Sequence, residues 1–219
     1  MRKTIIESII RNKLIVIVRN VSDDQLIPFC QAVFDGGIRC LEITYKSDGT
    51  ADEHTANQIR LVTTHFGDRL TIGAGTVLTP HQVQLTAEAG GNFVISPDVN
   101  KEVISETVNR GLVSIPGAFT PTEIAEADRY GADFVKLFPA SALGTSYIKA
   151  IKNPISHIRL LAVGGIHMKS ISEYLSAGIC GFGIGSNLTN RELLEKNDYA
   201  AITALSRQYV EAVGRGVAL

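Results

Sequence analysis

The sequence predicts a closed (β/α)8 barrel of the TIM type, built as one domain over residues 1–219. Eight short apolar runs of strand length recur along the chain, segments with helical patterning lie between them, and glycine-bearing turns such as FDGGIR and RYGAD precede most of the runs. This alternation indicates a parallel sheet with helical crossovers. A chain of 219 residues, 45% of them hydrophobic, can bury the core of one compact barrel, and the alternative is an open doubly wound sheet.

The elements follow one another in a regular order. The predicted strands are LIVIV (14–18), CLEIT (40–44), LTIGA (70–74), FVIS (93–96), LVSIP (112–116), FVKLF (134–138), LLAV (160–163) and GFGIG (181–185). Before the first strand, MRKTIIESII predicts a short amphipathic helix. It is not predicted to be a signal peptide, because polar residues interrupt its apolar residues too often.

The helices between the strands have recognisable first turns. Ser22 is a candidate N-cap ahead of an apolar stripe at helical spacing, and Thr79 precedes Pro80 at a first-turn position. The stretch TPTE (120–123) has the arrangement of a capping box. A last helix from about residue 198 to residue 213 is expected to cover the outside of the barrel.

Composition excludes several classes of partner. A net charge of −1 gives no reason to expect binding to nucleic acid or to an anionic membrane. No apolar run approaches the length that spans a bilayer. Cys30, Cys40 and Cys180 are odd in number and widely spaced, which predicts buried free thiols and a reducing, cytoplasmic location.

Two charged residues interrupt apolar strands. Side chains alternate between the two faces of a strand, so Glu42 of CLEIT and Lys136 of FVKLF both point into the barrel while their apolar neighbours face the helices. Barrel enzymes do their chemistry at the carboxyl ends of such strands. One interpretation is a structural ion pair. The other is that burial lowers the pKa of Lys136 and yields a free amine nucleophile.

Small residues end three of the strands. AVGGI (162–166) and GIGSNL (183–188) follow the seventh and eighth strands, where barrels often bind phosphate through backbone N–H groups. GAGTVL (73–78) leaves room for a ligand and offers the Thr76 hydroxyl. Each stretch alone is equally compatible with a simple turn, and together they favour a phosphorylated small-molecule ligand.

A metal centre is not favoured, because several convergent ligands would be needed. The histidines form no close-spaced pair. They are His54, His65, His81, His157 and His167.

Taken together, the motifs resemble those of a known enzyme family. LEIT, IGAGTVLTP, FVISP, IPGAFTPTE, VKLFPAS, YIKAIK, GGI and GIGS stand in the order and at the approximate spacing of the 2-keto-3-deoxy-6-phosphogluconate (KDPG) / 4-hydroxy-2-oxoglutarate (KHG) aldolases. The similarity extends from about residue 5 to residue 213. It implies a homotrimeric class I aldolase on a (β/α)8 barrel that needs no cofactor or metal and releases pyruvate from a phosphorylated keto acid.

The resemblance also assigns roles to residues. Lys136 is implied as the Schiff-base former and Glu42 as the general acid/base. The remaining matches are implied to contact substrate. They are Arg19, Lys46, Thr76, Pro97, Phe138, Gly164, Gly165, Gly185 and Ser186.

Three positions depart from the gluconate-type pattern. Lys46 stands where those members often have an arginine that binds the substrate carboxylate, and a lysine offers one point charge instead of a planar fork. Carboxylate binding then shifts toward Arg19. Val163, in AVGG where PTGG is common, resembles the branch acting on 2-keto-3-deoxy-6-phosphogalactonate (KDPGal), and Asp98 replaces a glycine. The sugar acid is therefore left open between the two epimers and the unphosphorylated hydroxy-oxoglutarate.

Two other functional classes remain as alternatives. A phosphate-binding isomerase or synthase would explain the glycine turns but not an inward lysine facing a glutamate. A non-catalytic barrel that senses a phosphorylated ligand or binds RNA would show a basic patch, and the Lys and Arg residues are not clustered.

Overall fold

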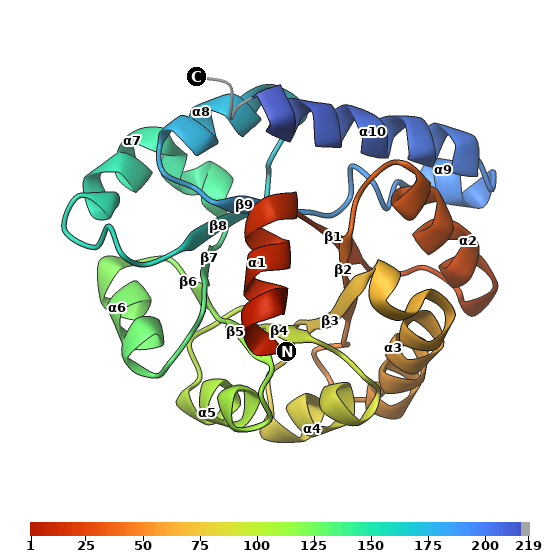
Figure 1. Ribbon diagram of the computed structural model, residues 1–219, viewed down its shortest axis with the longest axis horizontal. Coiled ribbons are helices and arrows are strands. Elements are labelled where there is room, and N and C mark those ends of the chain that lie inside the picture. The colour runs from red at the N-terminus through yellow and green to blue at the C-terminus, as the bar shows by residue number, and fades with distance from the viewer. Residues whose placement is uncertain (216–219) are drawn as a thin grey trace.

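The computed structural model describes residues 1–215, and residues 216–219 of the predicted domain lie outside the described residues. It confirms the barrel: parallel strands form one sheet in the order β5-β4-β3-β2-β1-β9-β8-β7-β6, surrounded by helices (Figure 1). The strands are β1 (Leu14–Val18), β2 (Cys40–Thr44), β3 (Thr71–Gly75), β4 (Phe93–Ile95), β5 (Val113–Ile115), β6 (Gly117–Ala118), β7 (Val135–Leu137), β8 (Leu160–Val163) and β9 (Gly181–Ile184).

The sheet closes through a strand that is divided in two. The predicted fifth strand (112–116) contains β5 and ends at Pro116, which has no N–H to donate to a ladder, and the unpredicted short strand β6 follows it directly. β5 pairs with β4, whereas β6 pairs with β7. The carbonyl oxygen of Pro116 still accepts a 2.9 Å hydrogen bond from the amide of Lys136, so the segment bonds to both neighbours and completes the ring.

The helices lie outside the ring with one exception. They are α1 (Arg2–Asn12), α2 (Asp23–Asp35), α3 (Asp52–Phe66), α4 (Pro80–Glu88), α5 (Lys101–Asn109), α6 (Pro121–Arg129), α7 (Ala140–Lys152), α8 (Ile171–Ser176), α9 (Arg191–Glu195) and α10 (Tyr199–Arg215), with short 3-10 turns η1 (Gly67–Arg69) and η2 (Met168–Ser170). No helix of the described chain has both the length and the apolar character needed to cross a membrane.

Local sequence accounts for where these helices begin. Thr79 and Thr120 each form a capping box with the residue three positions later, and each is followed by proline. Ser22 does precede α2, but its hydroxyl donates to the Gln25 side chain and does not cap the backbone. The last helix begins and ends within two residues of the predicted bounds.

The exception is α1, which lies across the amino-terminal end of the barrel and appears at the centre of Figure 1. Ile9 of α1 packs into the apolar interior of the barrel, beside Ile15, Phe93 and Phe134. An ion pair of 2.9 Å from Arg2 to Asp133 fastens the start of the helix. The helix thereby fills one end of the barrel and leaves the carboxyl end for a site.

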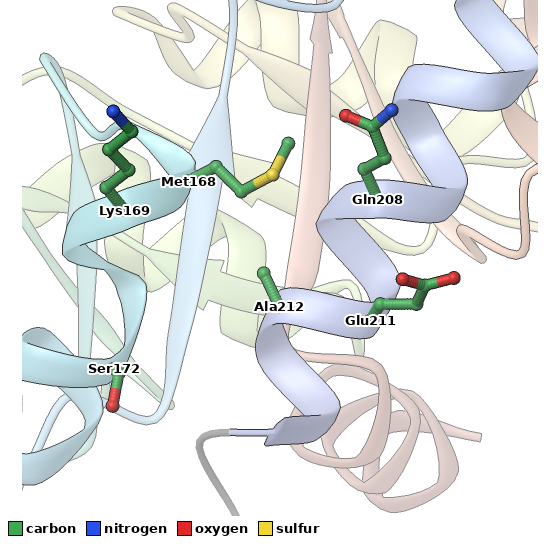
Figure 2. A pocket seen from close by; sticks show the side chains of 6 residues that line it. All are labelled: Met168, Lys169, Ser172, Gln208, Glu211 and Ala212. Atoms are coloured by element: carbon green, nitrogen blue, oxygen red, sulfur yellow. The ribbon is translucent and has the colours of Figure 1, made fainter.

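On the outer surface, α10 packs beside η2 and α8 (Figure 2). Met168 of η2 and Ala212 of α10 line opposite sides of a shallow groove of about 430 Å³. None of the charged residues at the strand ends line this groove. Its two sides show that α10 lies against the segment that follows β8.

Candidate active site

A cavity of about 1000 Å³ opens at the carboxyl ends of the strands, opposite α1. It is larger than the groove beside α10, and it receives the inward-pointing charged side chains. The predicted site residues that line it are Arg19, Glu42, Thr76, Pro97, Lys136, Phe138, Gly164, Gly165, Gly185 and Ser186. Residues from seven strands or the loops after them therefore meet in one place.

Lys136 lies at the centre of β7, where Val135 and Leu137 pack outward against the helices. Its side chain is 8% exposed, and its Nζ lies 4.7 Å from the centroid of the Phe138 ring. Burial lowers the pKa of Lys136, Glu42 opposes that shift, and Arg19 adds to it. A fraction of free amine is therefore present at lower pH than for an exposed lysine.

Glu42 faces the same interior from β2 and is 3% exposed. Burial raises the pKa of Glu42 to about 7, and the nearby charges of Lys136 and Arg19 limit that rise. Its carboxylate lies against Gly75 of β3, where any side chain would overlap it, so the glycine of GAG makes room for it. Lys136 and Glu42 are not among the ion pairs of the described residues, which weakens the interpretation of a purely structural pair.

The shifted pKa of Glu42 predicts a pH-dependent stability. An unfolded Glu42 loses its proton near its ordinary pKa of 4.5, whereas the folded one keeps it to about 7. Between these values the folded state binds more protons, so this residue lowers the free energy of unfolding as pH rises from 4.5 to 7. We expect Glu42→Gln to stabilise the protein by up to about 3 kcal/mol more at pH 8 than at pH 4.5, at about 1.4 kcal/mol per pKa unit.

Denaturant unfolding of the variant and of the wild type at both pH values measures this difference. The variant Glu53→Gln makes the same carboxylate-to-amide replacement at an exposed position of α3, and it controls for the general effect of pH on a glutamate. An equal effect of Glu42→Gln at pH 4.5 and pH 8 would contradict the expectation.

A polar wall flanks Glu42. Arg19, directly after β1, donates a 3.0 Å hydrogen bond from Nη2 to Oγ1 of Thr76, which follows β3. Thr76 has a φ of 55°, a left-handed backbone conformation that is uncommon for threonine. The guanidinium and the hydroxyl therefore converge over β2, and this arrangement suits a carboxylate.

Lys46 does not line the cavity, although the family resemblance implies that it contacts substrate. It is exposed and is not among the residues that line the cavity, whereas its neighbour Ser47 is. The chain turns after Tyr45, whose side chain packs outward and hydrogen-bonds near α4, and this turn carries Lys46 away from the strand end.

The two glycine loops form the opposite wall. Gly164 and Gly165 have φ values of 90° and 70°, and a side chain at Gly165 would overlap Ser141. After β9, Gly185 begins a turn in which its carbonyl oxygen accepts from the amide of Leu188 at 2.9 Å. In the described chain, the backbone N–H groups of residues 165, 166, 186 and 187 donate to no protein acceptor. Such clustered free N–H groups suit an anionic ligand.

Sequence reasoning missed part of the cavity wall. Asn20 and Gln25 enter from the segment after β1, and Asn187, Thr189 and Arg191 enter from the segment after β9. These residues lie in loops or near the start of a helix, where no strand alternation predicts which way a side chain points. Strand alternation does identify three further inward residues. They are Ile17, Val163 and Gly183.

The described residues include no group of three or more His, Cys, Asp or Glu side chains arranged to hold a metal ion. His167 does line the cavity, directly after the GGI stretch. The chemistry that the cavity offers is thus a buried amine, a carboxyl group with a pKa near neutrality, a carboxylate-binding wall and an anion-binding wall.

Comparison with known proteins agrees with this chemistry. The family model for KDPG and KHG aldolase matches residues 5–205. A 2-dehydro-3-deoxy-phosphogluconate aldolase of Treponema pallidum is 34% identical over 96% of this chain and 98% of its own. A 2-dehydro-3-deoxy-6-phosphogalactonate aldolase of Escherichia coli is 35% identical over 91% of this chain and 96% of its own.

Solved structures give the same result. A native KDPGal structure superposes with a TM-score of 0.85 at 33% identity, covering 94% of this chain and 96% of its own. The KDPG aldolase of Legionella pneumophila, captured with pyruvate as a covalent carbinolamine, has a TM-score of 0.83 at 28% identity and covers 92% of this chain and 96% of its own.

Proposed function

This chain belongs to the KDPG and KHG aldolase family, and from that premise we propose that it cleaves a phosphorylated 2-keto-3-deoxy sugar acid to pyruvate and an aldehyde through an imine on Lys136. The observation that carries the proposal is a buried lysine of lowered pKa that shares one cavity with a glutamate whose pKa is about 7. A relative whose solved structure holds covalent pyruvate supports the same chemistry.

In the proposed mechanism the free amine of Lys136 attacks the C2 ketone of the substrate and forms a carbinolamine. Glu42 donates a proton to the departing hydroxyl, water leaves, and a protonated imine remains. Glu42, now a carboxylate, takes the proton of the C4 hydroxyl as the C3–C4 bond breaks. The electrons of that bond flow into the imine, so the aldehyde departs and an enamine remains. Protonation at C3 and hydrolysis release pyruvate and restore Lys136.

Each wall of the cavity has a place in this proposal. The Arg19 and Thr76 pair binds the carboxylate of the pyruvate half. Pro97 and Phe138 supply apolar contacts beside Lys136. Gly164, Gly165, Gly185 and Ser186 bind the phosphate at the far end of the substrate. Lys46 lies outside the cavity wall, which gives carboxylate binding to Arg19.

The substrate class includes two epimers, the 6-phosphogluconate and 6-phosphogalactonate derivatives. The relatives named for each are 34% and 35% identical, so overall similarity does not separate them. Val163 lies in the cavity wall beside Gly164 and offers no hydrogen bond to a substrate hydroxyl. We favour the galactonate epimer as the physiological substrate because AVGG, which contains Val163, resembles the galactonate-type branch, and we expect the gluconate epimer and 4-hydroxy-2-oxoglutarate to be further substrates.

Release of pyruvate from each purified substrate, followed with lactate dehydrogenase, tests the proposal. We expect cleavage of at least one phosphorylated epimer. Absence of cleavage and of a borohydride-trapped pyruvate adduct in folded protein would favour the alternative of another phosphate-binding barrel enzyme.

We also propose that the reaction requires no cofactor or metal ion. The support is that Lys136 supplies the electron sink itself as an imine. Incubation with EDTA followed by assay is expected to leave the rate unchanged, and loss of activity that Zn²⁺ or Mg²⁺ restores would contradict this.

A homotrimer and a cytoplasmic location complete the proposed function. The trimer is supported by the family resemblance, and light scattering is expected to give three times the chain mass of 23.6 kDa. Three cysteines without disulfide bonds support a reducing compartment, which cell fractionation tests.

A further inference from the structure

The side chain of Asn187 joins the two glycine loops of the cavity. Its Nδ2 donates a 2.9 Å hydrogen bond to the carbonyl oxygen of Ile166, in the loop after β8. The same nitrogen donates a 2.9 Å hydrogen bond to the hydroxyl of Tyr209 on α10. An amide nitrogen carries two hydrogens, so both bonds form at once. One side chain therefore links the loop after β9 to the loop after β8 and to a surrounding helix.

The helix end of this link is fixed. Tyr209 is 3% exposed and belongs to the main core between the sheet and the helices. The adjoining stretch of α10 lies against η2, and Met168 of η2 faces α10 across the groove that Gln208 and Ala212 also line (Figure 2). Because η2 continues directly from the loop after β8, the Tyr209 hydroxyl is held at a set position relative to both loops.

The Asn187 link joins the two loops whose free backbone N–H groups suit an anion. Free N–H groups at residues 165 and 166 lie in one loop, and those at residues 186 and 187 lie in the other. A phosphate held by both loops needs these donors at one separation, and flexible loops would lose entropy on binding it. The Asn187 side chain fixes that separation before the ligand arrives.

We propose that Asn187, anchored by Tyr209, is a positioning residue that sets the spacing of the two glycine loops and thereby the preference for phosphorylated over unphosphorylated 2-keto acids. This inference depends on the proposed function for its substrate class. It adds a residue outside the matched motifs, and it predicts an effect confined to the phosphate end of the substrate, since the Lys136 end does not contact this link.

The test replaces Asn187 with Ala and compares two substrates. We expect KM for the phosphorylated sugar acid to rise about 5- to 10-fold, the scale of one or two lost neutral hydrogen bonds. kcat/KM for 4-hydroxy-2-oxoglutarate, which has no phosphate, should stay within about twofold. Tyr209→Phe keeps the bond to Ile166 and removes only the anchor, so it should shift the same ratio in the same direction by a smaller factor.

A matched control uses another asparagine of the same segment. Asn190 accepts hydrogen bonds from the amides of Glu192 and Leu193 and does not line the cavity. Asn190→Ala should therefore leave the ratio of KM values unchanged. Equal KM increases for both substrates in Asn187→Ala, or no change for either, would overturn the inference and leave Asn187 a structural contact only.

A binding measurement separates this inference from the proposed function. Inorganic phosphate is expected to raise the Tm of the wild type, and a severalfold higher phosphate concentration should be needed for the same shift in Asn187→Ala. Should the wild type cleave no keto acid, the proposed function fails while this comparison still decides the role of Asn187. Equal phosphate dependence in both proteins would count against the inference whatever the substrate.

Discussion

Replacing Lys136 with Met is expected to lower aldol cleavage by on the order of 10⁴-fold or more and to abolish the pyruvate adduct trapped by borohydride. Methionine has no amine, so neither the carbinolamine nor the imine can form. It matches the length of the lysine stem and suits a side chain that is 8% exposed, so the barrel should fold. Lys136→Ala removes the same amine and should give the same result.

Peptide mass mapping after reduction with pyruvate measures the outcome directly. The wild type should carry one reduced pyruvate on the peptide that contains Lys136. Lys149→Ala, which removes an exposed lysine of the neighbouring α7, serves as the control and should keep both adduct and activity. An adduct at an active-site lysine in Lys136→Met would refute the assignment of the nucleophile.

Replacing Glu42 with Gln is expected to reduce kcat by about 10²- to 10⁴-fold, the usual contribution of a positioned acid/base group. Glutamine has the same shape but exchanges no proton, so KM should change little. In the wild type, Glu42 must carry the proton that it donates during dehydration, so its pKa of about 7 predicts that its contribution to kcat/KM falls as pH rises through neutrality. That limb should be missing in the variant.

Steady-state rates of pyruvate release between pH 5 and pH 9 give both results. Glu42→Asp retains a carboxylate on a shorter stem and should recover part of the rate, which a purely structural role for the side chain would not predict. A Gln variant within tenfold of the wild type, with its pH limb intact, would assign proton transfer to another group.

Most of the fold could be predicted from the sequence because its pattern is local. Alternation placed Leu41 and Ile43 outward and Glu42 inward, and the structure has all three in those positions. The sequence does not predict β6, because its two residues, Gly117 and Ala118, lie beyond the apolar run that ends at Pro116. The structure shows that the run pairs with β4 as far as Ile115, and that Gly117 and Ala118, just beyond the run, pair with β7.

The residues of the cavity wall also differ in how far the sequence predicts them. Residues at strand ends were predictable, because the direction of a strand side chain follows from its parity. Lys46 was placed by its distance along the motif, and the turn after Tyr45 carries it out of the cavity wall. Asn187 could not be found from the sequence, because its importance comes from Ile166 and Tyr209, each about twenty residues away along the chain.

The position of α1 has a consequence for the order of events in turnover. With Ile9 and its neighbours filling the amino-terminal end of the barrel, the mouth at the carboxyl end serves for both entry and exit along the described chain. In the proposed mechanism the keto half is tethered covalently at the deeper position while the cleaved aldehyde lies nearer the mouth. The aldehyde therefore departs first and pyruvate second, which makes cleavage an ordered process. In the synthetic direction pyruvate must load before its acceptor, and excess aldehyde should act as a dead-end inhibitor by occupying the passage ahead of it.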